Sequence, residues 1–147
     1  MKYKYSALFM VGTLGSFFSY LFGGFDSLMI ALIVLMSIDF LSGLLLAVVF
    51  KKSKKTESGR LSSAAGIKGL SKKIFILFLI AMSQQLDIIL TTSFIRDGAV
   101  ISFIFMEGLS ILENSTLAGL KVPSVIKNAL EVLNKGRNND EWNINNS

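Results

Sequence analysis

Three acidic side chains lie inside long runs of apolar residues, where a charge is costly. Asp39 lies near the middle of one run, Asp87 just past the middle of a second, and Glu107 near the middle of a third. None of these runs contains a Lys or Arg that would pair with its acid. At the centre of a bilayer each carboxylate would cost roughly 2.5–3.5 kcal/mol if it faced lipid. We therefore expect all three to face protein or water.

Helical spacing gives each acid small or polar companions on its own face. In one interpretation these faces meet in an oligomer and line or gate a hydrated lesion. In the other, the carboxyls are protonated, because desolvation disfavours the charged form, and they hydrogen-bond inside a closed bundle. Spacing alone leaves both interpretations open. The three sets are Asp39, Gly43 and Ala47; Gln84, Asp87 and Thr91; and Glu107, Ser110 and Asn114.

The composition removes most catalytic chemistry. The chain has no Cys and no His, so it lacks disulfides, thiolate metal ligands and the side chain most often used as an acid or base near neutral pH. No nucleophile with an adjacent base accompanies the three acids. We therefore expect no enzymatic activity, no cofactor and no metal centre.

The elements that hold the acids are predicted to be membrane-spanning helices. The mean hydropathy of +0.59 exceeds that of ordinary soluble domains. We measured the apolar segments against the roughly 20 residues that cross a hydrocarbon core. The second segment, with fifteen Leu, Ile, Val or Phe residues, is the strongest. The first is interrupted by small residues. In the fourth, the cost of Glu107 cancels most of the favourable free energy of membrane insertion. The four segments are Tyr5–Phe22, Ser27–Phe50, 74–95 and 99–112. We expect an all-α integral membrane fold of four transmembrane helices in two hairpins, with three spans as the alternative.

The distribution of basic residues predicts the orientation. Loop 51–73 carries eight of them against one acid, whereas the turn at 23–26 has none and the turn at 96–98 has only Arg96. Short loops rich in Lys and Arg stay in the cytoplasm, so four spans place both termini inside. The Gly- and Ser-rich stretch 58–66 predicts a flexible connection near anionic lipid headgroups. The basic residues of this loop are Lys51, Lys52, Lys54, Lys55, Arg60, Lys68, Lys72 and Lys73.

A further helix is predicted after Pro123. Its apolar residues recur at helical spacing on one face, which indicates an interfacial or partner-binding helix, or alternatively a helix packed on the chain's own loops. We expect a transmembrane unit over 1–120, followed by a cytoplasmic amphipathic helix and polar tail over 121–147. The apolar residues of this face are Val122, Val125, Ile126, Ala129, Leu130 and Leu133.

Five stretches in this order, 39–47, 66–73, 86–88, 107–114 and 119–123, together resemble the bacteriophage holin family of the toxin-secretion and phage-lysis type. The resemblance covers about residues 39 to 133, and the first apolar segment does not contribute to it. The positions that carry it are Asp39, Gly43, Asp87, Glu107, Asn114 and Pro123.

The resemblance implies a small, non-enzymatic homo-oligomer of the bacterial cytoplasmic membrane. Such a protein assembles at a set time into lesions that release a cell-wall-degrading endolysin, or in some loci a large toxin. A small ion channel or transporter, and a membrane scaffold that recruits a soluble partner through the 122–133 face, are the alternatives. The net charge of +5 does not indicate nucleic acid, because the basic residues cluster beside apolar runs and so favour anionic lipid.

Overall fold

The computed structural model describes residues 2–51 and 62–132, with side chains from Tyr5 onward, and every regular element in these residues is a helix. The predicted all-α class is therefore confirmed. A further helical segment, 124–132, follows the last labelled element. The labelled elements are α1 (Lys2–Phe22), α2 (Ser27–Leu45), the short π-helical η1 (Leu46–Phe50), α3 (Ser63–Leu90) and α4 (Ile95–Leu117).

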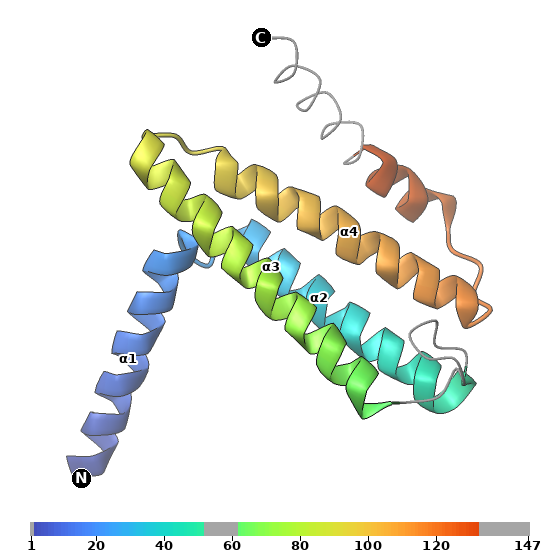
Figure 1. Cartoon of the computed structure of the whole chain (residues 1–147), viewed down its shortest axis with the longest axis horizontal. Helices are drawn as coiled ribbons and strands as arrows, with labels where there is room; N and C mark the ends of the chain where they lie inside the picture. The colour runs from blue at the N-terminus through green and yellow to red at the C-terminus, as the bar shows by residue number, and fades with distance from the viewer. Residues whose placement is uncertain (1, 52–61, 133–147) are drawn as a thin grey trace.

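Helices α2, α3 and α4 lie side by side with alternating chain direction, whereas α1 diverges from them at the α1–α2 turn (Figure 1). The most extensive helix contact is between α2 and α4, and α1 touches the bundle mainly at α3. The predicted pairing into two separate hairpins is not confirmed. Instead, α2, α3 and α4 form one three-helix unit, and α1 extends away from it.

The α1–α2 turn depends on two glycines. Gly23 and Gly24 have φ angles of +75° and +98°, a region that L side chains rarely adopt. The Gly24 N–H donates to the carbonyl of Ser19 at 2.7 Å, as in a Schellman motif that ends a helix. A Cβ atom at Gly23 would collide with the side chain of Gln84 on α3. The turn therefore lies directly against α3.

Three helical stretches are long and apolar enough to cross a membrane, namely Tyr5–Phe22, Ser27–Phe50 and Ser63–Leu90. Four spans are not confirmed. The first segment meets the criterion although small residues interrupt it, whereas α4 does not. Helix α4 is more polar because it carries four charged residues, Arg96, Asp97, Glu107 and Glu113. It also begins earlier than the predicted 99–112 segment and ends later.

The flexible connection predicted for 58–66 is wrong from Ser63 onward, because α3 begins there. Gly66 and Gly69 each cost roughly 1 kcal/mol relative to Ala in a helix interior. Ala64, Ala65 and the long apolar sequence that follows compensate for this cost. Lys68, Lys72 and Lys73 are therefore helical residues, and Lys51 ends η1 with a left-handed φ of +51°. Lys52, Lys54, Lys55 and Arg60 lie outside the described residues.

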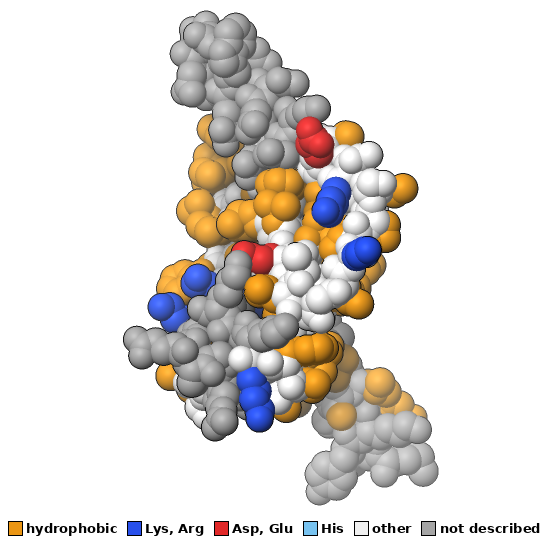
Figure 2. All heavy atoms as spheres, turned by 90° about the vertical axis from the view of Figure 1, so that its right-hand side faces the viewer, with side chains coloured by type: hydrophobic (Ala, Val, Ile, Leu, Met, Phe, Trp, Pro, Cys, Tyr) orange, Lys and Arg blue, Asp and Glu red, His pale blue; other side chains and the backbone are white. Residues whose placement is uncertain are grey.

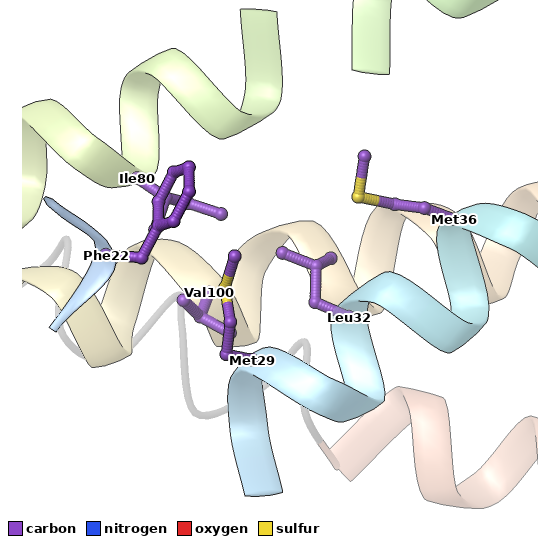
Figure 3. Close-up of a cluster of buried hydrophobic side chains, with 6 residues drawn as sticks. All are labelled: Phe22, Met29, Leu32, Met36, Ile80 and Val100. Atoms are coloured by element: carbon purple, nitrogen blue, oxygen red, sulfur yellow. The ribbon is translucent and has the colours of Figure 1, made fainter. Parts of the chain in front are cut away.

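The core lies where the end of α1 meets α2, α3 and α4. Phe22, Met29, Leu32, Met36, Ile80 and Val100 form its buried cluster (Figure 3). Most other large apolar side chains lie outside: Phe9 is 77% exposed and Ile89 is 75% exposed. A soluble monomer rarely exposes so much contiguous apolar surface. Lipid is the solvent that suits it.

The helical segment 124–132 folds back onto α4. A Cβ atom at Gly108 would lie 2.7 Å from a methyl carbon of Leu130, so this glycine permits the close approach. Val125 and Ile126 remain exposed, and Leu133 lies outside the described residues. The contact agrees with a helix packed on its own chain, although its support is α4 and not a loop. The boundary at residues 120 and 121 stays a prediction.

Candidate functional site

An ion-pair cluster joins the three packed helices. The Lys73 Nζ of α3 lies 3.0 Å from Asp39 Oδ2 of α2 and 2.5 Å from Glu107 Oε2 of α4. The three side chains are only 12%, 7% and 9% exposed. With a rise of about 1.5 Å per residue, this cluster lies roughly 20 Å along the helices from the two turns at the other end of the bundle. Two acids and one base from different helices thus meet between the packed helices with little exposed surface.

Polar side chains complete the environment of Asp39. The Ser110 hydroxyl donates to Asp39 Oδ1 at 2.5 Å, and the Asn114 amide donates to the same oxygen at 3.3 Å. Asn114 also donates to the Ser42 hydroxyl at 2.8 Å, and that hydroxyl donates to the Asp39 carbonyl at 3.0 Å. Within the predicted polar face of α4, Ser110 and Asn114 therefore meet α2, whereas Glu107 pairs with Lys73 of α3. Gly43 lies half-buried on the same stretch of α2.

The prediction that Lys73 faces lipid headgroups is wrong, because its ammonium is the partner of both acids. The base that pairs with Asp39 of α2 and Glu107 of α4 comes from a third helix, α3. A signal for this was present in the sequence. Lys73 continues the helical spacing of Ile76, Leu77 and Ile80, which form the face of α3 that packs on the core.

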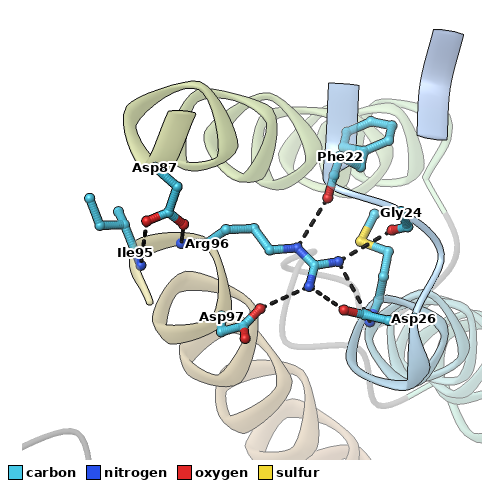
Figure 4. Close-up of polar contacts among 8 residues, drawn as sticks. Phe22, Gly24, Asp26, Asp87, Ile95, Arg96 and Asp97 are labelled. Atoms are coloured by element: carbon cyan, nitrogen blue, oxygen red, sulfur yellow. Dashed lines mark hydrogen bonds and ion pairs between the residues drawn. The ribbon is translucent and has the colours of Figure 1, made fainter. Parts of the chain in front are cut away.

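The opposite end of the bundle holds a second group, the corner cluster of Asp26, Asp87, Thr92, Arg96 and Asp97. Figure 4 shows its three acids and Arg96. The Asp87 carboxylate accepts hydrogen bonds from the Thr92 hydroxyl at 2.5 Å and from the backbone N–H groups of Ile95 and Arg96 at 3.2 and 2.8 Å. The two backbone N–H groups would otherwise be unpaired at the start of α4, where a negative charge is favourable. Asp87 therefore links the end of α3 to the start of α4.

Asp87 does not join Asp39 and Glu107. It is buried, as expected, but it lies in the last turn of α3, 14 residues from Lys73 and so roughly 21 Å along the helix. Gln84, predicted on the same face, lies with Asp87 beside a polar pocket of about 290 Å³ next to Gly23. The structure thus separates the predicted polar residues into two clusters.

The Arg96 side chain, which we expected in an external turn, is buried and connects the two turns. Its Nε donates to the Phe22 carbonyl at 3.0 Å, and its Nη2 donates to the Gly24 carbonyl at 3.3 Å. The guanidinium also pairs with Asp26, the N-cap residue of α2, and with Asp97 at 2.8 Å. Arg96 therefore satisfies carbonyls that the end of α1 leaves unpaired.

The hydrogen bonds from Arg96 hold the pKa of Asp26 below its ordinary value. A carboxyl whose pKa is lower in the folded state stabilises the protein above its unfolded pKa, and this contribution disappears as the pH falls through the folded pKa. Asp26 is almost half exposed, so solvent screening keeps this contribution small. The corner should therefore loosen only under strongly acidic conditions.

Replacing Arg96 with Lys should weaken the corner even though the charge is kept. An ammonium cannot reproduce the planar guanidinium contacts with two carbonyls and two carboxylates at once. We expect a loss of about 2 kcal/mol in unfolding free energy, because at least one buried carbonyl loses its donor. Thermal unfolding of the purified protein in detergent measures the effect. Unchanged unfolding would show that the carbonyls find other donors.

Comparison with known proteins identifies the family. Residues 16–135, most of the chain, match the bacteriophage holin family. The chain belongs to this family. The holin match begins within α1, so it extends further toward the N-terminus than the sequence resemblance that started at Asp39. Together with the three long apolar helices, it makes the chain a membrane protein.

Relatives of this holin-family chain occur in Listeria, Clostridium and Bacillus. The uncharacterized protein Lmo0128 of Listeria monocytogenes is 39% identical over 128 residues, which cover 86% of each chain. An uncharacterized 14.9 kDa protein of Clostridium perfringens is 34% identical over 124 residues, which cover 83% of this chain and 88% of the relative. YqxH of Bacillus subtilis is 35% identical over 115 residues, or 78% and 76% of the two chains. No solved structure matches.

No metal-binding site is evident in the part of the chain that the structure describes. No group of three or more acidic side chains there is arranged to hold a metal ion. The two polar clusters pair carboxylates with Lys73 and Arg96 instead. Their arrangement is suited to holding the helices together, and the ion pairs would weaken if water entered between the helices.

Proposed function

We propose that the chain is a phage-type holin that oligomerises in the bacterial cytoplasmic membrane and forms lesions through which an endolysin or a large toxin leaves the cell. The observation that carries the proposal is the buried ion-pair cluster of Asp39, Lys73 and Glu107 between three helices. Buried charges are costly in apolar surroundings, and water reduces that cost. A closed bundle with this cluster inside therefore gains hydration when its helices separate around a water-filled opening.

Helix α4 can cross the membrane in this proposal because other parts of the protein contact its middle. Lys73 pairs with Glu107, and Leu130 of the segment 124–132 packs against Gly108. Its 23 residues reach about 34 Å, enough for a hydrocarbon core of roughly 30 Å. Four spans would place both termini and the basic 51–73 region in the cytoplasm. The corner cluster would then lie at the outer surface.

The topology can be tested with single cysteines, because the chain has none of its own. Ser63→Cys should resist a membrane-impermeant thiol reagent in intact cells, and Ser93→Cys should react with it. Ser93 is exposed in the turn between α3 and α4, and Ser63 begins α3 at the basic end. Reporter fusions at each terminus complete the assay. External labelling at Ser63 would overturn the orientation, and a periplasmic N-terminus alone would reduce the spans to three.

Controlled expression in bacteria tests the function directly. Cells that produce this chain together with a cytoplasmic endolysin should lyse abruptly after a delay, and cells that produce the chain alone should lose viability and membrane potential at the same time. Crosslinking in native membranes should show a series of oligomers, since polar groups in lipid require protein partners.

The nature of the released cargo separates the alternatives. A selective channel would dissipate ion gradients and yet retain endolysin, because a fixed pore excludes a folded protein. A scaffold would leave the ion gradients intact and would also retain the endolysin. Retention of a folded cytoplasmic reporter protein after loss of membrane potential would therefore count against a holin, as would a purely monomeric chain at lytic levels.

A further inference from the structure

A cleft of about 500 Å³ opens between α3 and α4 beside the ion-pair cluster, with Lys68 and Lys72 among its lining residues. Ligand sites commonly have volumes of roughly 300–1,000 Å³. We propose that this cleft binds an anionic phospholipid, with its phosphate between Lys68 and Lys72. The proposal rests on the membrane orientation proposed above, and it is independent of lesion formation.

The charges that line the cleft favour an anion. Lys68 and Lys72 are one helical turn apart on α3, and both are exposed. Neither forms an ion pair with any residue in the described stretches 2–51 and 62–132. The carboxylates of Asp39 and Glu107 also line the cleft, but Lys73 lies between them and pairs with both. The entrance is therefore positive, and an approaching phosphate meets Lys68 and Lys72 first.

The lining changes from basic to apolar along α3. Ile76 and Met106 line the cleft on the side nearer the corner cluster, and Ile76 lies about 12 Å beyond Lys68 at the helical rise of α3. A second, almost wholly apolar hollow of about 410 Å³ lies between α2 and α3 and shares Phe40 and Lys73 with the cleft. A free phosphate has no part that suits these apolar walls. A phospholipid has a phosphate that suits the basic lining and hydrocarbon chains that suit the apolar lining beyond it.

The cleft also lies at the end of the bundle where headgroups would be. Figure 2 looks onto the end at which α2 ends and α3 begins, and it shows basic side chains there beside apolar ones. Basic pockets between transmembrane helices on the cytoplasmic side are a recognised way of binding anionic lipid. This cleft has that position in the proposed orientation.

Glycines in the same helix provide a steric test. Gly69 lines the cleft and has open space where a Cβ atom would be, so Gly69→Leu should fill the cleft without changing its charge. Gly66, one turn earlier, also has open space but does not line the cleft, which makes Gly66→Leu the matched control. Both substitutions replace a poor helix former with a good one, so the fold is retained.

The experiment uses the full-length protein in a neutral detergent, titrated with phosphatidylglycerol, phosphatidylcholine or glycerol phosphate and followed by native mass spectrometry and thermal unfolding. Phosphatidylglycerol should bind in a 1:1 complex and raise the unfolding temperature, whereas the other two should not. Lys68→Gln with Lys72→Gln, and separately Gly69→Leu, should weaken binding about tenfold or more. Gly66→Leu, and Lys121→Gln with Lys127→Gln at exposed sites elsewhere, should bind normally.

Each other outcome counts against the site. Equal losses in the two double-lysine variants would reduce the effect to general surface charge. Normal binding by Gly69→Leu would place the lipid outside the cleft, and binding of glycerol phosphate as tight as that of the lipid would make the ligand a soluble phosphate. Lysis is not measured, so a failure here leaves the lesion proposal standing, and a protein that binds lipid but forms no lesion would contradict only that proposal.

Discussion

Lys73→Met should make the purified protein unfold at a markedly lower temperature and should reduce the amount that accumulates in the membrane. The substitution keeps most of the apolar stem but removes the ammonium that Asp39 and Glu107 share. Breaking a buried ion pair by removing one partner costs about 3–5 kcal/mol, because the other charge stays in apolar surroundings. Thermal unfolding in detergent and quantification of the membrane fraction measure the two effects.

Two further variants make this prediction specific to the ion-pair cluster. Lys127→Met removes the same charge from an exposed position, and its effect should stay within about 0.5 kcal/mol. Combining Lys73→Met with Asp39→Asn and Glu107→Gln should restore much of the stability, since neutral replacement of a whole buried ionic group is often harmless. If Lys73→Met and Lys127→Met are equally stable, the cluster does not hold the helices together.

The helices themselves could be predicted from the sequence because each contains an apolar run, and the all-helical class follows from that alone. The start of α3 could not be predicted in this way. Glycine and serine near Ser63 indicate a flexible loop when each is weighed alone, but Ala64, Ala65 and the long apolar sequence that follows favour a helix that begins at Ser63. The length of the whole helix thus decided a boundary that the local glycines and serines misplaced.

The site could be predicted in part. The polar faces around Asp39 and Glu107 do meet, as their spacing indicated, but the partner that joins them is Lys73 on a third helix. Pairing between helices depends on which faces pack, and a single sequence does not state this. The role of Asp87 was missed for a related reason. Its position was read as mid-span because the apolar run continues beyond it, whereas the helix ends at Leu90 and the carboxylate caps α4.

Glu107→Gln should insert normally and trigger lysis later than the unaltered chain. Lys73 lies between two carboxylates in the closed bundle, so removing one of the two charges leaves a balanced pair with Asp39. The glutamine keeps the size of the side chain and its ability to accept a hydrogen bond. Loss of one intramembrane charge makes the closed state cheaper by up to about 3 kcal/mol, a bias on the order of a hundredfold in a two-state equilibrium.

Lysis time and membrane potential, recorded at matched membrane levels, measure this delay. Glu113→Gln is the matched control, because it removes the same charge from an exposed position on the same helix and should leave the timing unchanged. Glu107→Ala also loses the hydrogen bond, so it should weaken assembly as well as delay triggering. Asp87→Asn should behave differently from Glu107→Gln. It impairs the cap of α4, so it should lower thermal stability without a selective effect on timing.

The comparison decides between the two interpretations of the intramembrane acids. If Asp39 and Glu107 only held helices together by hydrogen bonds, their amide variants would keep normal timing, because amides preserve most of those bonds. A charge that must become hydrated as the bundle opens would instead have to be present for the lesion to form on time. Normal timing in both Asp39→Asn and Glu107→Gln would leave the carboxylates as packing elements and would remove the hydrated lesion lining from the mechanism.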